Sequence, residues 1–212
     1  MASAKSDSTS KADQPPLAGV IRKLWSAEAP LFRDHLLRLD TASRRMRFGY
    51  GASSNYLETY AERMSEPGTL TYAYVEDGAV RAAAELKQLG GLWGHDAEAA
   101  LSVEATHQNQ GLGTKLLGRL IQSARYRGLQ HLILNCLPEN ERMQAVAKKH
   151  DAGLSIAHGE VKGEITADGS AYFSFFEEAF ENRVSLMFGL IDMQSRLSKS
   201  EGAKTSSLGP RR

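Results

Sequence analysis

The stretch from Glu98 to Cys136 constrains the fold more than any other part of this chain. It begins with a predicted strand, EAALSVEATH (98–107), and ends with a shorter buried one, HLILNC (131–136). Between them, apolar side chains recur at helical spacing from Leu112 to Ala124, and Gly128 ends the predicted helix. Strand, helix and strand in this order predict a right-handed crossover between two parallel strands.

The elements around this crossover predict an α/β fold, a mixed sheet flanked by helices. Alternating Leu70, Tyr72 and Tyr74 lead into Asp77-Gly78, a preferred tight turn, so residues 69–86 are predicted to form a hairpin. The other predicted elements are strand 19–25, helices 29–40 and 53–64, helix 139–150, hairpin 154–167 and helix 173–197.

The composition limits the classes of protein to which the chain can belong. With 42% hydrophobic residues, its 212 residues suffice for one globular domain, predicted over residues 19–168. A net charge of +1 gives no electrostatic argument for nucleic acid or a membrane as a partner, and no stretch has the length of a membrane span. The single cysteine, Cys136, cannot form an internal disulfide, so we expect a cytoplasmic protein.

Both ends of the chain differ in composition from the predicted domain. Residues 1–16 and 199–212 are small, polar and charged, and both are predicted to be disordered tails. Residues 173–197 predict a helix with two apolar stripes. One stripe would cover the sheet. The other would either contact a second copy in a homodimer or be wedged between parts of the domain.

The loop before the crossover helix carries Gly111 and Gly113, a residue type used where backbone approaches something closely. A helix start has unpaired N–H donors and a partial positive charge, so this junction suits a pyrophosphate; the alternative is a tight turn without a ligand. Leu116 stands where a dinucleotide fingerprint needs its third glycine, and no Gly-Lys-Ser or Gly-Lys-Thr of a P-loop is present. One cysteine and six scattered histidines give no zinc spacing, so no metal is predicted.

The segment QNQGLG (108–113) resembles the Q/R-x-x-G-x-G/A motif of the GNAT N-acetyltransferase superfamily. The order of predicted elements, from about residue 19 to about residue 168, is also similar to that family. The resemblance implies the GNAT acyl-CoA N-acyltransferase fold, in which two parallel strands of a mixed central sheet splay apart. It also implies that acetyl-CoA lies between them as a co-substrate.

The resemblance assigns residues to the acetyl-CoA site. In the family, the backbone matched by LSV (101–103) holds the acetyl carbonyl and the pantetheine arm, and the backbone matched by 108–114 surrounds the pyrophosphate. An asparagine that often opens the next helix, near the pantetheine arm, matches Asn140. The residues assigned to acetyl-CoA are therefore Leu101, Ser102, Val103, Gln108, Asn109, Gln110, Gly111, Leu112, Gly113, Thr114 and Asn140.

The chain departs from the family pattern at the general acid. Many members carry a tyrosine four residues before a Gly-Phe pair, and it protonates the departing thiolate. If Asp151-Ala152 replaces that pair, the tyrosine position is Ala147; if Gly153-Leu154 does, it is Lys149. Neither is a tyrosine. His150 is a nearby alternative donor, although a histidine near a helix C-terminus is often only a favourable dipole contact.

The general base is predicted on the strand that lines the gap. An acceptor amine with a pKa near ~10.4 is protonated at pH 7, so a base or a chain of waters aids the reaction. Glu98 precedes Val103 by five residues, where family members often carry a glutamate, and it is the preferred candidate; the alternative is a solvated strand end. Glu104 is expected to point away, and His95 and Asp96 are weaker candidates.

The segment SRRMRF (43–48) carries three arginines in five residues, which is typical of a solvated helix end. It also resembles a segment near the start of GNAT domains that acetylate lysines on metabolic enzymes. Helices in this part of the family line the acceptor side, so Arg44, Arg45 or Arg47 is a candidate contact for an anionic acceptor.

Together these features predict an N-acetyltransferase that moves an acetyl group from acetyl-CoA to an amine by direct attack. The sequence leaves open whether the acceptor is a small amine or a lysine of a protein. The alternative from another class is a non-catalytic sensor that binds acyl-CoA and regulates a partner, because neither the acid nor the base is clear.

Overall fold

The structure, a computed structural model, describes residues 18–157 and 159–166. These residues form a seven-stranded mixed sheet with the strand order β1-β2-β3-β4-β5-β7-β6. The strands are β1 (Val20–Leu24), β2 (Thr69–Glu76), β3 (Ala79–Gln88), β4 (Asp96–Val103), β5 (His131–Cys136), β6 (Gly153–Ala157) and β7 (Glu160–Thr166).

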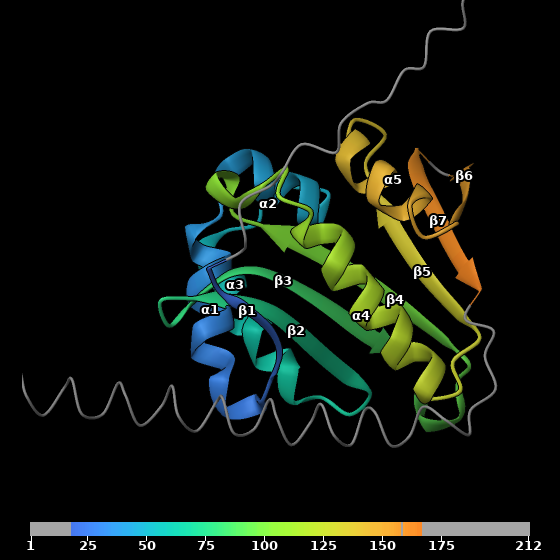
Figure 1. Cartoon of the computed structure of the whole chain (residues 1–212), viewed down its shortest axis with the longest axis horizontal. Helices are drawn as coiled ribbons and strands as arrows, with labels where there is room; N and C mark the ends of the chain where they lie inside the picture. Colours follow the sequence, from blue (N-terminus) through green and yellow to red (C-terminus); the bar gives the residue numbers. More distant parts are fainter. Residues whose placement is uncertain (1–17, 158, 167–212) are drawn as a thin grey trace, which may run out of the picture.

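Helices cover both faces of the sheet, with α1, α2 and α3 on one face and α4 and α5 on the other (Figure 1). The α-helices are α1 (Ala29–Arg38), α2 (Thr41–Phe48), α3 (Ser54–Tyr60), α4 (Leu112–Tyr126) and α5 (Glu141–Lys148). Short 3₁₀ helices are η1 (Ser26–Glu28), η2 (Ala61–Ser65), η3 (Gly91–Trp93) and η4 (Ala105–His107).

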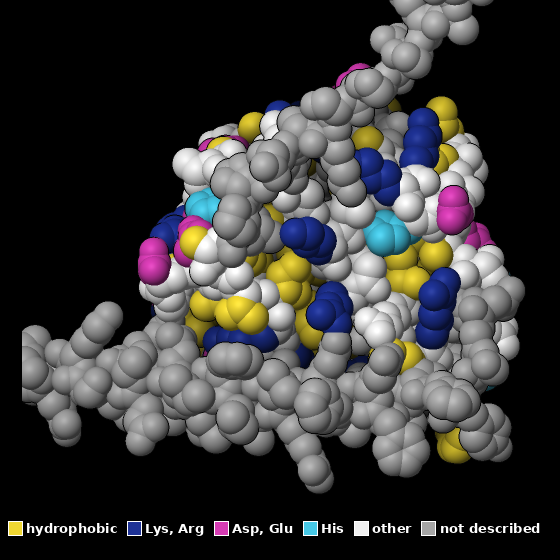
Figure 2. Space-filling model, viewed as in Figure 1, with side chains coloured by type: hydrophobic (Ala, Val, Ile, Leu, Met, Phe, Trp, Pro, Cys, Tyr) yellow, Lys and Arg dark blue, Asp and Glu magenta, His cyan; other side chains and the backbone are white. Residues whose placement is uncertain are grey.

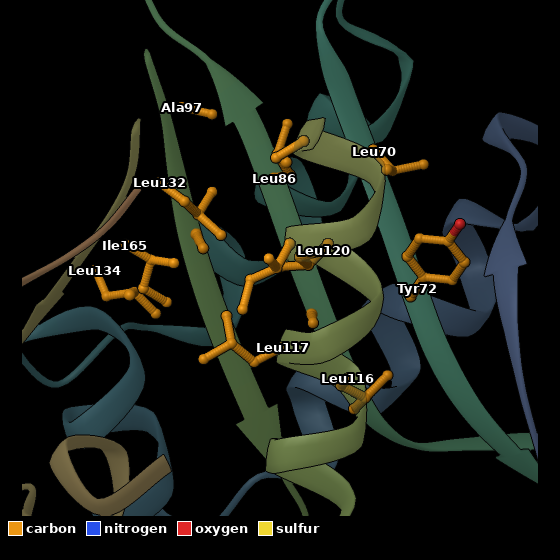
Figure 3. Close-up of a cluster of buried hydrophobic side chains, with 14 of the residues drawn as sticks. Leu70, Tyr72, Leu86, Ala97, Leu116, Leu117, Leu120, Leu132, Leu134 and Ile165 are labelled. Atoms are coloured by element: carbon orange, nitrogen blue, oxygen red, sulfur yellow. The ribbon is translucent and has the colours of Figure 1, made fainter. Parts of the chain in front are cut away.

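Each face of the sheet has its own hydrophobic core, which confirms the predicted mixed α/β architecture. Leu116, Leu117 and Leu120 of α4 are fully buried against the sheet, where Leu86 and Leu132 meet them (Figure 3). On the opposite face a second cluster is formed by α1, α3 and η2, with Phe32, Leu36 and Leu57 at its centre. The apolar stripe of α4 therefore packs against the sheet, as its helical spacing predicts.

The predicted right-handed crossover corresponds to β4, α4 and β5, and its parallel pairing is confirmed. These two strands pair in parallel only over Asp96–Ala99 and His131–Leu134, and every other neighbouring pair in the sheet is antiparallel. The predicted hairpin of β2 and β3 is also confirmed. Asp77 and Gly78 both have positive φ angles, 50° and 71°, as a two-residue type I′ turn requires.

Two expectations about the elements were wrong. A separate helix over 41–48 is not among the predicted elements, but the structure has one, α2: the Asp40 carboxylate accepts a hydrogen bond of 2.6 Å from the Ser43 N–H. Residues 43–48 form the end of this helix, but the Arg47 side chain is buried instead of solvated. Asp40 had been assigned to the end of the preceding helix. The strand predicted over 98–107 is also shorter, since it ends at Val103 and is followed by η4.

The remaining part of the chain is not described. The predicted helix over 173–197, the predicted homodimer contact through it and the two predicted tails lie outside the described residues. Within residues 18–157 and 159–166, no helix combines the length and the apolar character needed to cross a membrane.

Candidate active site

The parallel strands β4 and β5 diverge after Ala99, which leaves the second half of β4 unpaired with β5 in the described part of the chain. The Glu104 N–H donates to the Arg81 carbonyl of β3 at 3.0 Å. Since alternate N–H groups of a strand point the same way, those of Leu101 and Val103 point to the side that β5 has left. Backbone donors are thus directed into the opening between the two strands.

A cavity of about 220 Å³ occupies this opening. Its walls come from β4, the loop before α4, α2 and α5. Six of the residues assigned to acetyl-CoA line it: Leu101, Ser102, Val103, Gln108, Gly113 and Asn140. The others, Asn109, Gln110, Gly111, Leu112 and Thr114, lie on the adjoining loop and the first turn of α4.

The N-terminus of α4 is open to a ligand. Asn109 and Gly111 have left-handed φ angles of 62° and 76°, which turn the loop sharply into the helix. Gly111 is the N-cap and supplies no side chain, so the first N–H groups of α4 have no side-chain cap. Lys and Arg side chains are spread over the face that α4 covers, and Asp and Glu lie mainly at its edges (Figure 2). This arrangement favours an anionic group.

The side chains of Gln108 and Asn140 hold the cavity walls together. The Gln108 amide donates to the Val103 carbonyl at 3.0 Å and to the Ser43 hydroxyl at 3.3 Å, and its oxygen accepts from Arg142. Asn140 caps α5 through a 3.1 Å bond from the backbone of that helix, and its amide donates to a carbonyl of α2 at 3.3 Å. Helices α2 and α5 are therefore fixed on either side of β4.

The backbone favours Ala147 over Lys149 as the match to the family's tyrosine. Asp151 has a φ of 57°, a left-handed conformation that favours glycine, so Asp151-Ala152 is the better match to the Gly-Phe pair. Gly153, by contrast, begins β6 without a positive φ angle. Ala147 is only 2% exposed, and its methyl group cannot donate a proton.

His150 lies away from the 220 Å³ cavity. Its Nε2 atom is 2.9 Å from the Thr114 carbonyl of α4, and Gly118 provides the space for its ring. The ring lines a separate groove of about 1060 Å³ between α4 and the β6–β7 hairpin. The structure therefore does not bring His150 together with Leu101 or Val103.

Glu98 lies on the other face of the sheet from α4, in a second cavity of about 150 Å³. Side chains alternate along a strand, so Glu98, Ala100 and Ser102 all face α1, α2 and α3. The Glu98 carboxylate is 3.5 Å from the Asn135 amide. Arg47 lines both cavities and separates them.

Arg47 belongs to a buried ionic group at this boundary. Its guanidinium pairs with Glu85 and donates to the Tyr60 hydroxyl at 2.7 Å; the Arg47 and Glu85 side chains are 9% and 10% exposed. Burial disfavours the charged guanidinium, but the Glu85 carboxylate outweighs it and raises the pKa of Arg47. Burial, together with Glu85, raises the pKa of Tyr60 to about 12.

The other two arginines of that segment also have partners. Arg44 donates to the carbonyls of Leu37 and Leu39 at 2.6 and 2.9 Å, and Arg45 pairs with Glu139. All three guanidinium groups thus have a partner within the protein, although the buried Nε–H of Arg47 has none in the described residues. A contact with an anionic acceptor stays a prediction.

The sequence analysis missed a buried polar network beside the first cavity. His35 of α1 lies 2.9 Å from the Ser102 hydroxyl through Nε2 and 3.2 Å from the Glu104 carboxylate through Nδ1. Glu104 points away from the opening, toward α1. In the sequence, His35 lies far from Ser102 and Glu104, so no local motif predicts this network. The weaker base candidates, His95 and Asp96, lie at the opposite end of β4 and line neither cavity.

The described ranges contain neither a cluster of metal-ligand side chains nor an activated thiol. They contain no group of three or more His, Cys, Asp or Glu side chains arranged to hold a metal ion. Cys136 is buried and unpaired, and burial, followed by the charge of Glu160, raises the pKa of its thiol. A raised pKa makes the thiol a poor nucleophile.

Comparison with known proteins agrees with this geometry. Residues 35–152 match the model of the acetyltransferase (GNAT) family. The chain therefore belongs to the acetyltransferase (GNAT) family, a family of acyltransferases. A search of curated protein sequences gave no match.

Solved structures share the fold at low sequence identity. The GNAT domain of S. lividans PAT is 19% identical with a TM-score of 0.62, and the match covers 70% of this chain and 90% of that one. The putative acetyltransferase yncA from Salmonella typhimurium, solved with its cofactor acetyl-CoA, is 20% identical with a TM-score of 0.57 over 72% and 96% of the two chains. A phosphinothricin acetyltransferase from Sinorhizobium meliloti, in complex with AcCoA, is 13% identical with a TM-score of 0.54 over 75% and 96%.

Proposed function

We propose that this protein is an acetyl-CoA-dependent N-acetyltransferase that transfers the acetyl group to an amine by direct attack. The observation that carries the proposal is the opening between β4 and β5, with backbone donors of β4 directed into it and the uncapped start of α4 at its edge. Two structures of the same fold, from Salmonella typhimurium and Sinorhizobium meliloti, contain acetyl-CoA.

The backbone supplies the groups that suit acetyl-CoA. Peptide N–H groups at the start of α4 suit the pyrophosphate, because they carry partial positive charge and have no side-chain cap. The N–H groups of Leu101 and Val103 suit the thioester carbonyl. Donors fixed in this way stabilise the negative charge that develops on the carbonyl oxygen during attack.

The acceptor amine is proposed to enter through the second cavity. Three carboxylates and three cationic side chains line it, and Glu66 and Glu85 are paired with Lys87 and Arg47. Glu98 is therefore the carboxylate left to attract an ammonium group. Releasing a proton from an amine with a pKa near ~10.4 costs about 4–5 kcal/mol at pH 7. Glu98 is the preferred base, because Glu85 is already paired with Arg47. Both a small amine and a protein lysine fit this proposal.

The leaving thiolate has no tyrosine donor. Ala147 has no acidic group that could donate a proton, and His150 is hydrogen-bonded to the Thr114 carbonyl outside the first cavity. We therefore propose that water protonates the thiolate. A cytoplasmic location and a homodimer stay predictions from the sequence.

The deciding experiment measures CoA release from acetyl-CoA with a thiol reagent, in the presence of a panel of small amines and lysine peptides. An N-acetyltransferase releases CoA in proportion to acetylated amine. The alternative, a non-catalytic acyl-CoA sensor, binds acetyl-CoA in calorimetry but gives no amine-dependent release. That second result would refute the transferase.

A further inference from the structure

Ser102, His35 and Glu104 are arranged in the order of a nucleophile, a base and an orienting carboxylate. The Ser102 hydroxyl lies 2.9 Å from Nε2 of His35, and Nδ1 of His35 lies 3.2 Å from the Glu104 carboxylate. The His35 side chain is fully buried, and the Glu104 side chain is 10% exposed. Nucleophilic serines are recognised by this geometry rather than by their order in the chain.

The tautomer of His35 follows from Glu104. Arg38 donates to this carboxylate at 2.9 Å and Arg81 at 3.2 Å. Burial alone would raise the pKa of Glu104, but the hydrogen bond from His35 and the charge of Arg38 lower it to about 2. An ionised carboxylate only accepts, so Nδ1 of His35 carries the proton and Nε2 accepts from Ser102.

His35 is held in the neutral form that a base needs. Burial is the main cause that lowers its pKa, against the opposing influence of Glu104, so the imidazole is uncharged at neutral pH. With its proton directed to His35, the Ser102 oxygen keeps its lone pairs for another partner.

Ser102 is the member of the network that reaches the first cavity. The backbone N–H groups of Leu101 and Val103, on either side of it, point into the same opening. Arg47 lines this cavity as well, and its Nε–H has no hydrogen-bond partner in the described part of the chain. Donors for a developing oxyanion are therefore present beside the serine.

We propose that Ser102, with His35 as its base and Glu104 as a positioning residue, hydrolyses the acyl-CoA thioester through an acyl-serine when no amine is bound. The choice of thioester rests on the proposed function. The reaction would be a second activity of the same cavity, with water in place of the amine as the final acceptor.

The chemical steps balance without a further reagent. The Ser102 oxygen bonds to the thioester carbonyl carbon, its proton passes to Nε2 of His35, and the C–S bond breaks. That proton then leaves with CoA as its thiol. A water molecule attacks the acyl-serine while His35 accepts one of its protons, and the proton returns to Ser102 as the C–O bond breaks. The products are CoA and the free carboxylic acid.

A purely structural role makes different predictions. The same three residues hold α1 against β4, and a structural anchor of this kind has no covalent chemistry. A fluorophosphonate probe distinguishes the two roles, because it reacts with an activated serine and needs no acyl-CoA. The full chain is treated with the probe, digested and analysed by mass spectrometry.

We expect labelling at Ser102, and its loss in Ser102→Ala. The matched control is Ser123→Ala, since Ser123 is also buried but its hydroxyl bonds to Tyr72 and it lines neither cavity; labelling at Ser102 should persist in this variant. Glu104→Gln should slow labelling about tenfold and shift its pH profile. His35 is fully buried and its variants risk unfolding, so the conclusion depends on Ser102→Ala. Unlabelled wild type, or a label elsewhere, overturns the proposal.

A second measurement tests the reaction itself. Wild type is incubated with acetyl-CoA alone, and acid quenching should trap an acetyl group on Ser102, with slow CoA release that Ser102→Ala reduces at least about tenfold. Calorimetry in parallel separates this loss from a loss of binding. Acetylated amines without acetyl-serine or hydrolysis would refute the role of Ser102 and leave the proposed N-acetyltransferase activity intact. Failure to bind acetyl-CoA would refute the N-acetyltransferase activity, whereas labelling of Ser102 would still show that this serine is a nucleophile.

Discussion

The two cavities that meet at Arg47 are built in different ways. The first adjoins a continuous run of chain, 108–114; backbone N–H groups of β4 point into it, and mainly apolar side chains of α2 and α5 complete its walls. The second is lined by charged side chains that come from α2, η2, β3 and β4. The groups directed at a ligand are backbone donors in the first cavity and charged side chains in the second.

Because of this difference, we expect the two sites to tolerate different amino-acid substitutions. A backbone site survives most side-chain changes but fails when a new side chain fills its space. A site of buried charges fails when one charge loses its partner, because the remaining one stays desolvated. The following variants test this contrast in order of decreasing effect.

Arg47→Met should destabilise the protein by about 3–5 kcal/mol, because it leaves Glu85 buried and unpaired. Chemical denaturation measures the change. Arg45→Met is the matched control on the same helix: its pair with Glu139 is exposed, so little change in stability is expected. Adding Glu85→Leu to Arg47→Met should restore much of the stability. Equal losses of stability in the two single variants would show that the buried pair stabilises the protein no more than the exposed pair.

Gly113→Val should weaken acetyl-CoA binding by roughly 10²-fold or more, about 2.7 kcal/mol, with the fold retained. A Cβ atom added at Gly113 would lie 3.4 Å from Val146 and 4.0 Å from Leu101, so a branched side chain would fill the cavity between them. Calorimetry measures affinity and circular dichroism measures folding. Gly51→Val, where a Cβ meets nothing within 4 Å, is the control and should bind normally.

Glu98→Gln should lower the rate about 10²-fold near pH 7 with little change in acetyl-CoA affinity. Glutamine keeps the shape but cannot accept the proton. The deficit should shrink toward pH ~9.5, where more of the amine is already deprotonated. Glu58→Gln, on the exposed side of α3, should leave the rate unchanged. A deficit that stays constant with pH would mean that Glu98 shapes the site without accepting a proton.

His35→Gln should flatten the dependence of stability on pH below 6.5. The pKa of His35 is lowered in the folded protein, first by burial and also by Arg38, while Glu104 and Glu85 oppose the shift. The unfolded chain therefore binds the proton first, and wild-type stability falls as the pH drops through 6.5, by about 1.4 kcal/mol per unit at most. Denaturation at several pH values compares the two slopes. Parallel slopes would show that His35 is not responsible.

The same contrast explains what the sequence could predict. The fold and the loop at Gly111 and Gly113 follow from local patterns: helical spacing, alternation and a contiguous motif. Helix α2 was not predicted, because its N-cap residue, Asp40, also fits the end of the previous helix. Neither the pairing of Arg47 with Glu85 nor that of His35 with Ser102 has a local signature, since each joins residues brought together only by packing.

Arg47 lines both cavities, so its position has a consequence for two ligands bound at once. A ligand that drew this guanidinium toward one cavity would change the wall of the other, and the affinity of each ligand would then depend on whether its neighbour is present. Such cooperativity is reciprocal: if bound acetyl-CoA strengthens acceptor binding by some factor, bound acceptor strengthens acetyl-CoA binding by the same factor. Glu85 and Tyr60 restrain the guanidinium through hydrogen bonds, and stronger hydrogen bonds would make that factor smaller.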